Sequence, residues 1–218
     1  MNYSCLVLDH DDTLVKSTDQ IHYPAFCHTL AILRPHTPIS REDFKEACAF
    51  PGFLPLCVDT YGFTQEELDF ELQDWLSFVK EKIPDPHEGF RELLTQFRAL
   101  GGVLCVVSHS DESLIRRDYR HHFGFEPDYI YDLNYPHQKP SPAPLLDLME
   151  KTGFSPTDLL VVDDLPPGKE MAEKAGVDFV FAGWSDTAPS VYKQMNEEKI
   201  QTANRVDDLC LLLFSKKR

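Results

Sequence analysis

The first acidic cluster of the chain follows a short apolar segment. Residues 4–8 form this segment, and Asp9 and Asp11, two carboxylates separated by a single residue, come directly after it. At the end of a strand, such a pair brings two negative charges together, and a divalent hard cation can offset their repulsion. One carboxylate can then attack a phosphoryl group while the other handles protons, which divides one difficult step into two easier ones. An isolated Asp-x-Asp pair is also typical of a turn or a helix cap, because Asp favours both positions.

Attack on phosphorus needs further groups, and the chain contains a candidate for each. A magnesium ion and a lysine must neutralise the phosphate oxygens, and hydrogen-bond donors must position them. Asp164 is the candidate metal ligand, Ser108 the hydroxyl donor and Lys139 the cation. Taken singly, Ser108 could cap the following helix and Lys139 could be a solvated surface charge. Those explanations do not account for the placement of all the candidates together.

A calcium-binding loop is another interpretation of closely spaced aspartates. Counted from Asp9, such a loop requires Gly at the sixth position and Glu at the twelfth. Leu14 and Gln20 stand there instead, so the calcium loop is excluded.

Apolar runs that end in polar residues predict the strands that position these groups. Besides residues 4–8, such runs occupy 103–107 and 159–162, with weaker ones at 129–131 and 179–181, about five strands in all. Helical patterns that end at glycine lie between them, at 88–100, 142–152 and 166–175. This alternation predicts an α/β fold, a doubly wound parallel sheet with helices on both faces. Ligands of such sheets bind beyond the carboxyl ends of the strands, where Asp9, Ser108 and Asp164 are expected.

One interval is too long for a single crossover between parallel strands. Residues 16–87, 72 in number, separate Val15 from Glu88, whereas one helix with two loops needs about 25–35. Ser40 and a Thr64/Glu67 capping box mark the starts of two of the helices expected in this interval.

We therefore expect an inserted helical domain at residues 17–86, between the two parts of a core domain formed by residues 1–16 and 87–218. Candidates for lining a substrate pocket in the insertion are His22, Tyr23, Arg34, Phe53, Tyr61 and Trp75. Aromatic residues at helical spacing are more often core, so these remain candidates only.

Composition excludes several classes of partner. The net charge of −15 opposes binding to nucleic acid or to an anionic membrane, since both need a cationic face. No apolar run approaches the length of a membrane span, the N-terminus lacks the basic region of a secretory signal, and Lys216–Arg218 are expected to form a solvated tail. Six widely spaced cysteines without a CxxC motif argue against structural zinc and disulfides, and we expect a cytoplasmic protein.

Four segments, in order along the chain, resemble the motifs of the haloacid dehalogenase (HAD) superfamily. They are Leu-Val-Leu-Asp-His-Asp-Asp-Thr-Leu at 6–14, Val-Val-Ser at 106–108, Lys-Pro-Ser-Pro at 139–142 and Val-Val-Asp-Asp at 161–164. The resemblance covers essentially the whole chain. It implies a Rossmann-like HAD core, with the insertion in the place of the superfamily's helical cap of the first (C1) type.

The resemblance also implies a magnesium-dependent phosphatase acting on a small phosphorylated metabolite. Asp9 would attack phosphorus and become an aspartyl phosphate, and Asp11 would be the general acid and base, which requires a partly neutral carboxyl. The Asp9 carboxylate, the Asp11 backbone carbonyl and Asp164 would hold Mg²⁺. Ser108 and Lys139 would bind the phosphate.

Three positions depart from the commonest family pattern. Asp12 and Asp163 stand where Gly is usual, and Gly168 stands where a second acidic residue often lies. Counting back from Ala175 and Gly176 selects Asp164 as the metal ligand, which leaves Asp163 as a group behind the ligands or a helix cap.

Two other functions stay open at this point. A phosphomutase of the same superfamily keeps both aspartates of the first motif, and a binding or regulatory module can keep the fold without turnover. Dehalogenase and phosphonatase members carry no acid at the position of Asp11, so neither activity is expected. No motif identifies the leaving group, and the oligomeric state stays open.

Overall fold

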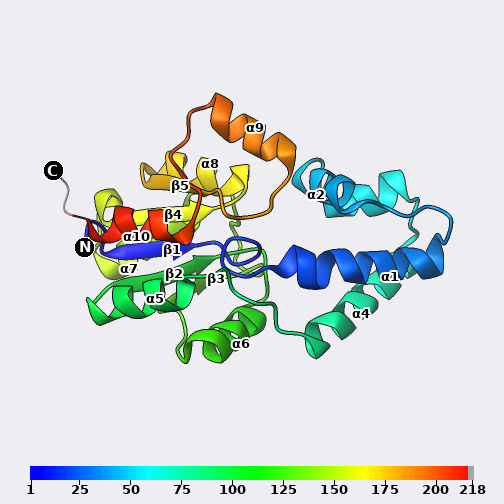
Figure 1. Cartoon of the computed structure of the whole chain (residues 1–218), viewed down its shortest axis with the longest axis horizontal. Coiled ribbons are helices and arrows are strands. Elements are labelled where there is room, and N and C mark those ends of the chain that lie inside the picture. The colour runs from blue at the N-terminus through cyan, green and yellow to red at the C-terminus, as the bar shows by residue number, and fades with distance from the viewer. Residues whose placement is uncertain (216–218) are drawn as a thin grey trace.

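The computed structural model describes residues 1–215 and contains one parallel sheet covered by helices (Figure 1). Its strands are β1 (Cys5–Leu8), β2 (Val103–Val107), β3 (Tyr129–Tyr131), β4 (Leu159–Asp163), β5 (Asp178–Ala182) and β6 (Thr202–Ala203). They pair in the order β3-β2-β1-β4-β5-β6, with every pairing parallel. The predicted doubly wound α/β fold is confirmed, and the two-residue β6 is the strand that the apolar pattern missed. Lys216–Arg218, the expected solvated tail, lie outside the described residues.

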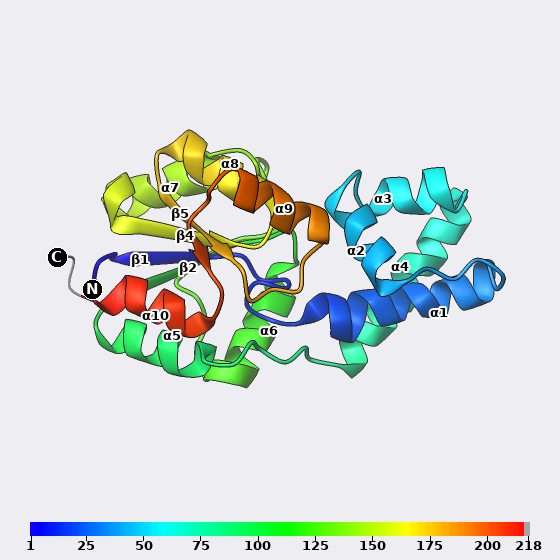
Figure 2. The same ribbon diagram turned by 45° about the horizontal axis from the view of Figure 1, so that its top comes forward.

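Helices cover both faces of the sheet, as Figure 2 shows from a second direction. Leu6 and Leu8 of β1 pack on α5 (Phe90–Ala99), α6 (Glu112–Phe123) and α10 (Val206–Phe214). Cys5 and Val7 alternate with them and pack on α7 (Ala143–Thr152) and α8 (Pro166–Ala175). Strands buried on both faces have no solvent-exposed face, so they appear in the sequence as continuous apolar runs.

The inserted segment forms a helical lobe beyond the carboxyl ends of the strands (Figures 1 and 2). Its elements are η1 (Thr18–His22), α1 (Tyr23–Leu33), α2 (Arg41–Ala49), α3 (Phe53–Pro55), η2 (Leu56–Thr60) and α4 (Gln65–Glu81). Ser40 caps α2 and the Thr64/Glu67 capping box opens α4, both as predicted. Phe26, Phe44 and Phe63 belong to an apolar cluster formed by lobe residues alone. The division into core and cap domains at residues 17 and 86 stays a prediction.

Helix α2 joins the lobe to the loop after β5. Lys45 Nζ lies 2.7 Å from Asp186 Oδ1, and Arg41 also pairs with Asp186. Glu46 accepts a hydrogen bond of 2.9 Å from the backbone N–H of Ser190, the second residue of α9 (Pro189–Glu197). These contacts hold the lobe over the edge of the sheet at which the predicted site residues lie.

Two expectations from composition can be compared with the structure. None of the helices within residues 1–215 is long and apolar enough to cross a membrane. All six cysteines are free thiols, as their wide spacing predicted.

Candidate active site

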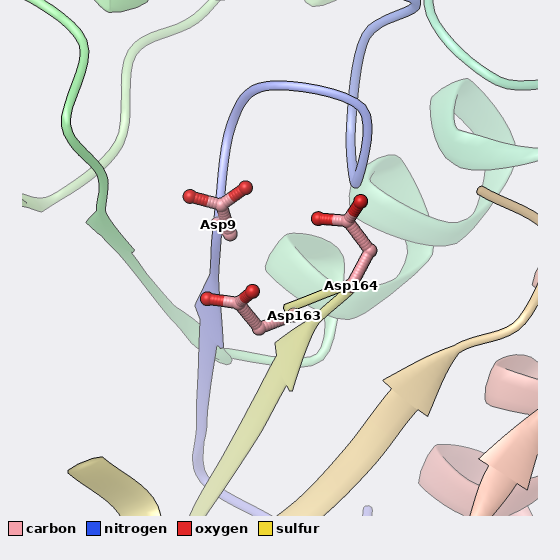
Figure 3. Close-up of side chains that lie close together, drawn as sticks. All are labelled: Asp9, Asp163 and Asp164. Carbon is pink, nitrogen blue, oxygen red and sulfur yellow. The ribbon is translucent and has the colours of Figure 1, made fainter. Parts of the chain in front are cut away.

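Three buried carboxylates meet at the carboxyl edge of the sheet, those of Asp9, Asp163 and Asp164 (Figure 3). Leu8 of β1 pairs with Val162 of β4 in the parallel sheet. Asp9, which follows Leu8, therefore lies beside Asp163 and Asp164, which follow Val162. One oxygen from each carboxylate lies within 4.8 Å of the others. Three carboxylate oxygens at this separation are the donor set that a hard divalent cation such as Mg²⁺ prefers, and the site therefore fits the predicted metal.

Asp164 is oriented by two hydroxyl groups. Thr13 Oγ1 donates to its Oδ1 at 3.0 Å, and Ser185 Oγ donates to its Oδ2 at 2.9 Å. Burial, together with the charge of Asp163, raises the pKa of Asp164 well above its usual range. No basic side chain within residues 1–215 forms an ion pair with this carboxylate, so a metal ion would stabilise its ionised form.

Lys139 bridges the ends of the two central strands. Its Nζ lies 2.7 Å from Asp9 Oδ1 and 2.6 Å from Asp163 Oδ2, and its side chain is only 6% exposed. Burial lowers the pKa of Lys139. The charges of Asp163 and Asp9 raise it by more than burial lowers it, so the net pKa lies above its usual range. Lys139 is therefore a buried cation held at Asp9, and the alternative of a solvated surface charge is wrong.

Asp163 also contacts the backbone at the residue before α8. Its Oδ1 accepts a hydrogen bond of 2.8 Å from the backbone N–H of Leu165, while its Oδ2 binds Lys139. Asp163 thus contacts Lys139 and the backbone just before α8, but it does not cap that helix, whose N-cap residue Leu165 has no side-chain cap. Its placement behind the metal ligands stays a prediction.

Asp11 points toward the helical lobe and meets His22. His22 Nε2 lies 3.6 Å from Asp11 Oδ1, and the Ser110 hydroxyl donates to Asp11 Oδ2. Trp75 Nε1 donates to His22 Nδ1 at 3.0 Å, which leaves a ring proton on Nε2, the nitrogen facing Asp11.

The environment of Asp11 favours its ionised form. Burial raises the pKa of Asp11. The His22 imidazole and the Ser110 hydroxyl lower it by more than burial raises it, so the net pKa lies below its usual range. This differs from the expectation of a partly neutral Asp11. In this arrangement the ring proton on His22 Nε2 faces the Asp11 carboxylate and stabilises its negative charge.

Ser108 lies at the end of β2 and is buried. Its Oγ accepts a hydrogen bond of 3.2 Å from the Ser110 backbone N–H. The side chain that caps α6 is instead Asp111, which accepts from the Ser113 N–H at 2.8 Å. The helix-cap explanation of Ser108 is therefore wrong, and its hydroxyl proton is free to point toward a ligand.

Comparison with protein-family models matches residues 3–176 to the haloacid dehalogenase-like hydrolases. The chain belongs to this family. The resemblance carried by the four sequence motifs is confirmed, and with it the expectation of a hydrolase. A comparison with curated protein sequences gives no significant match.

Solved structures share the fold of this HAD-like hydrolase over most of its length. A conserved haloacid dehalogenase-like protein of unknown function from Agrobacterium tumefaciens superposes with a TM-score of 0.77 at 20% identity, over 97% of each chain. A putative phosphoglycolate phosphatase from Lactobacillus plantarum gives 0.74 at 22%, over 98% of this chain and 99% of that one. CbbY from Rhodobacter sphaeroides, in complex with phosphate, gives 0.65 at 18%, over 82% and 85%. At these identities the similarity shows the fold.

Two of the departures from the HAD pattern belong together. A Cβ atom at Gly168 would lie 2.2 Å from Asp163 Oδ2, a separation at which something must shift. The Asp163 carboxylate thus occupies the space above α8 that a side chain at position 168 would need. With Asp163 in this position, a side chain at 168, including the second acidic residue that often lies there, would require the carboxylate to move.

The third departure, Asp12, adopts the backbone conformation for which glycine is usual. Its φ of +58° lies in the left-handed region, which Asp tolerates better than most residues. Its carboxylate accepts a hydrogen bond of 2.9 Å from the Thr18 N–H, and its carbonyl oxygen lies 2.8 Å from His87 Nε2. The side chain therefore stabilises the start of the helical lobe, which a glycine would not do.

A cavity of about 450 Å³ lies in front of Asp9, between the sheet edge of the hydrolase and its helical lobe. All the predicted site residues line it: Asp9, Asp11, Ser108, Lys139 and Asp164. Among the pocket candidates of the lobe, His22, Phe53 and Trp75 line it too.

The other three candidates are wrong. Tyr23 and Tyr61 pack on the apolar cluster of the lobe, and Arg34 pairs with Glu67 at 2.7 Å.

Four polar residues at the site escaped prediction from the sequence, although a strand-end pattern could have found two of them. Ser185 and Asp186 come shortly after β5, so the pattern that identified Asp9, polar residues after an apolar strand, also applies to them. Lys45 and Glu71 lie on lobe helices and line the cavity. Their sequence context does not distinguish them from ordinary charged surface positions.

Proposed function

We propose that this protein is a Mg²⁺-dependent phosphatase that hydrolyses a small phosphorylated metabolite through an aspartyl phosphate on Asp9. The observation that carries the proposal is the placement of Asp9, a buried carboxylate with Lys139 on one side and Asp164 on the other, at the edge of the cavity. Residues 17–86 would act as the cap over this site, on a core of residues 1–16 and 87–218.

The metal would be held by the carboxylates of Asp9 and Asp164 and by the backbone carbonyl of Asp11. Bound there, Mg²⁺ supplies positive charge that offsets the charge of the phosphate oxygens. The further negative charge would be met by Lys139, and the Ser108 hydroxyl would donate to a phosphate oxygen. Because Lys139 already touches Asp9, a phosphate bound to Lys139 is held next to the attacking oxygen.

In the first step Asp9 Oδ attacks phosphorus, and the bond between phosphorus and the leaving oxygen breaks. The leaving oxygen takes a proton from Asp11, whose carboxyl group must carry one at this step, while the neutral His22 imidazole orients Asp11 through its Nε2–H. In the second step the Asp11 carboxylate accepts a proton from water as the water oxygen attacks phosphorus and releases Asp9. Inorganic phosphate and the alcohol are the products, and Asp9 is regenerated.

The test is release of p-nitrophenol from p-nitrophenyl phosphate by the wild type and by Asp9→Asn, each with Mg²⁺ and with a chelator. We expect release that requires Mg²⁺ and is lost in the variant, while circular dichroism shows that the variant is folded. A panel of phosphorylated metabolites under the same conditions then identifies the preferred substrate. Substantial metal-independent release, or release retained by folded Asp9→Asn, would overturn the proposal.

A further inference from the structure

The part of the cavity that would hold the leaving group is walled mainly by apolar side chains. The apolar side chains that line the cavity include Phe44, Cys48, Phe53, Leu72, Trp75 and Leu133. The first five come from three helices of the helical lobe and the last from the loop after β3. A cavity of about 450 Å³ is in the range that encloses most of a small organic ligand, so these walls would contact the leaving group directly.

The lysines that line the cavity are already paired. Lys139 binds Asp9 and Asp163 at the phosphate end. Lys45, whose side chain is only 10% exposed, places Nζ 2.7 Å from Asp186 Oδ1 and 2.9 Å from the Asp186 carbonyl oxygen. Within residues 1–215 no arginine lines the cavity.

The two histidines of the lining do not supply a free cation either. His22 faces the Asp11 carboxylate. Burial, followed by the charge of Lys139, lowers the pKa of His109.

One of the lobe side chains that line the cavity is an acid without a hydrogen-bond partner in residues 1–215. Glu71, on α4, is buried and lines the cavity, and its carboxylate has no hydrogen-bond partner within the described chain. Seven acidic residues in all line the cavity, against the two lysines. Asp9 and Asp164 would be offset by Lys139 and the metal, and away from these the lining within the described residues offers no unpaired positive charge. A second anionic group on a ligand would be desolvated there without a counter-ion, which is strongly unfavourable.

From these observations we infer that the cavity selects phosphate monoesters whose leaving group is apolar and carries no negative charge of its own. The inference rests on the proposed phosphatase function and adds a substrate class to it. The single phosphate would be neutralised at the sheet edge, while the remainder of the molecule contacts the aromatic and aliphatic wall of the helical lobe. Substrates with a carboxylate or a second phosphate would be discriminated against, because Lys45 is neutralised by Asp186.

The test compares two aryl phosphates of nearly equal shape, 4-(methoxycarbonyl)phenyl phosphate and 4-carboxyphenyl phosphate. With Mg²⁺ we expect kcat/KM for the uncharged ester to exceed that for the carboxylate by about tenfold or more. Equal values, or a preference for the carboxylate, would overturn the inference and leave the phosphatase proposal intact. The same conclusion follows if only 2-phosphoglycolate is hydrolysed. No Mg²⁺-dependent hydrolysis of any phosphate ester would overturn the phosphatase proposal, and the inference with it.

A pair of variants tests the role of the Lys45–Asp186 ion pair. Asp186→Asn removes the countercharge of Lys45, so the preference for the uncharged ester should fall by about fivefold. The matched control is Asp19→Asn, because Asp19 pairs with Arg41, the other partner of Asp186, and does not touch Lys45. In the control the preference should equal that of the wild type. An unchanged preference in Asp186→Asn would show that Lys45 does not control anion selection.

Discussion

The contact between Asp163 and Gly168 makes a sharp prediction for Gly168→Ala. The added Cβ would lie 2.2 Å from Asp163 Oδ2 and 2.3 Å from its Cγ, so the carboxylate must move. It cannot move freely, because its oxygens bind Lys139 and the Leu165 N–H. Overpacking of this kind costs about 1–3 kcal/mol. A weakened buried ion pair adds to that cost, although Lys139 keeps Asp9 as a partner, and we expect a loss of about 2–4 kcal/mol.

The control places the same substitution where the clash is absent. In an Asp163→Gly background the side chain that blocks position 168 is gone, and Ala replaces Gly within α8. Alanine is then favoured by up to about 1 kcal/mol, because it has the higher helix propensity. The effect of Gly168→Ala on stability should therefore change sign between the two backgrounds.

Urea unfolding of the four proteins, followed by circular dichroism, measures both effects and their coupling. For a chain of this size, the loss in the wild-type background corresponds to a fall in Tm of roughly 5–15 °C. The coupling free energy should reach about 3 kcal/mol or more, as expected for residues in direct contact. Equal effects of Gly168→Ala in the two backgrounds would refute the steric reasoning.

Three further predictions concern the proposed metal site, the buried acid and the helical lobe. Asp164→Asn should raise the Mg²⁺ concentration required for half-maximal activity more than Asp163→Asn does, because Asp163 is already neutralised by a lysine; metal titration giving the reverse order would contradict this. Burial and the charge of Asp74 raise the pKa of Glu71 to about 7 from 4.5. Ionisation of Glu71 therefore destabilises the folded state. The free energy of unfolding of Glu71→Gln should rise relative to that of the wild type as pH increases between these two values, by about 3 kcal/mol at most. Urea unfolding of both proteins at pH 5 and pH 8 tests this, and a difference that does not change with pH would count against it. Phe26→Ala should cost about 3–5 kcal/mol in urea unfolding, because Phe26 is fully buried among aromatic rings in the lobe; a loss below about 1 kcal/mol would show that the lobe core is unimportant for stability.

The strands and the residues at their ends were predictable for one physical reason. A strand buried on both faces must be apolar throughout, so its end is marked by the first polar residue. This pattern located Asp9, Ser108 and Asp164, which the structure brings to one cavity. β6 escaped prediction because two residues are too few to form a recognisable run.

The arrangement of the helical lobe over the site was not predictable in the same way. The caps of α2 and α4 are local, since Ser40 and Thr64 bond to residues three positions ahead, and the sequence shows them directly. The Lys45–Asp186 pair joins residues 141 positions apart. The contact of His22 with Asp11 depends on how η1 leaves the core. Such contacts follow from tertiary packing, for which one sequence contains no local pattern.

The central claim, a phosphoryl group carried on Asp9, is tested most directly by trapping that group. In Asp11→Asn, p-nitrophenyl phosphate should still phosphorylate Asp9, because p-nitrophenolate leaves without a proton, whereas hydrolysis of the acyl phosphate loses its base. We expect a burst of one equivalent of p-nitrophenol, followed by acid quenching and mass spectrometry that places one phosphoryl group on the peptide containing Asp9. A phosphoryl group on another residue, or steady turnover by the wild type with neither burst nor adduct in the variant, would contradict the account.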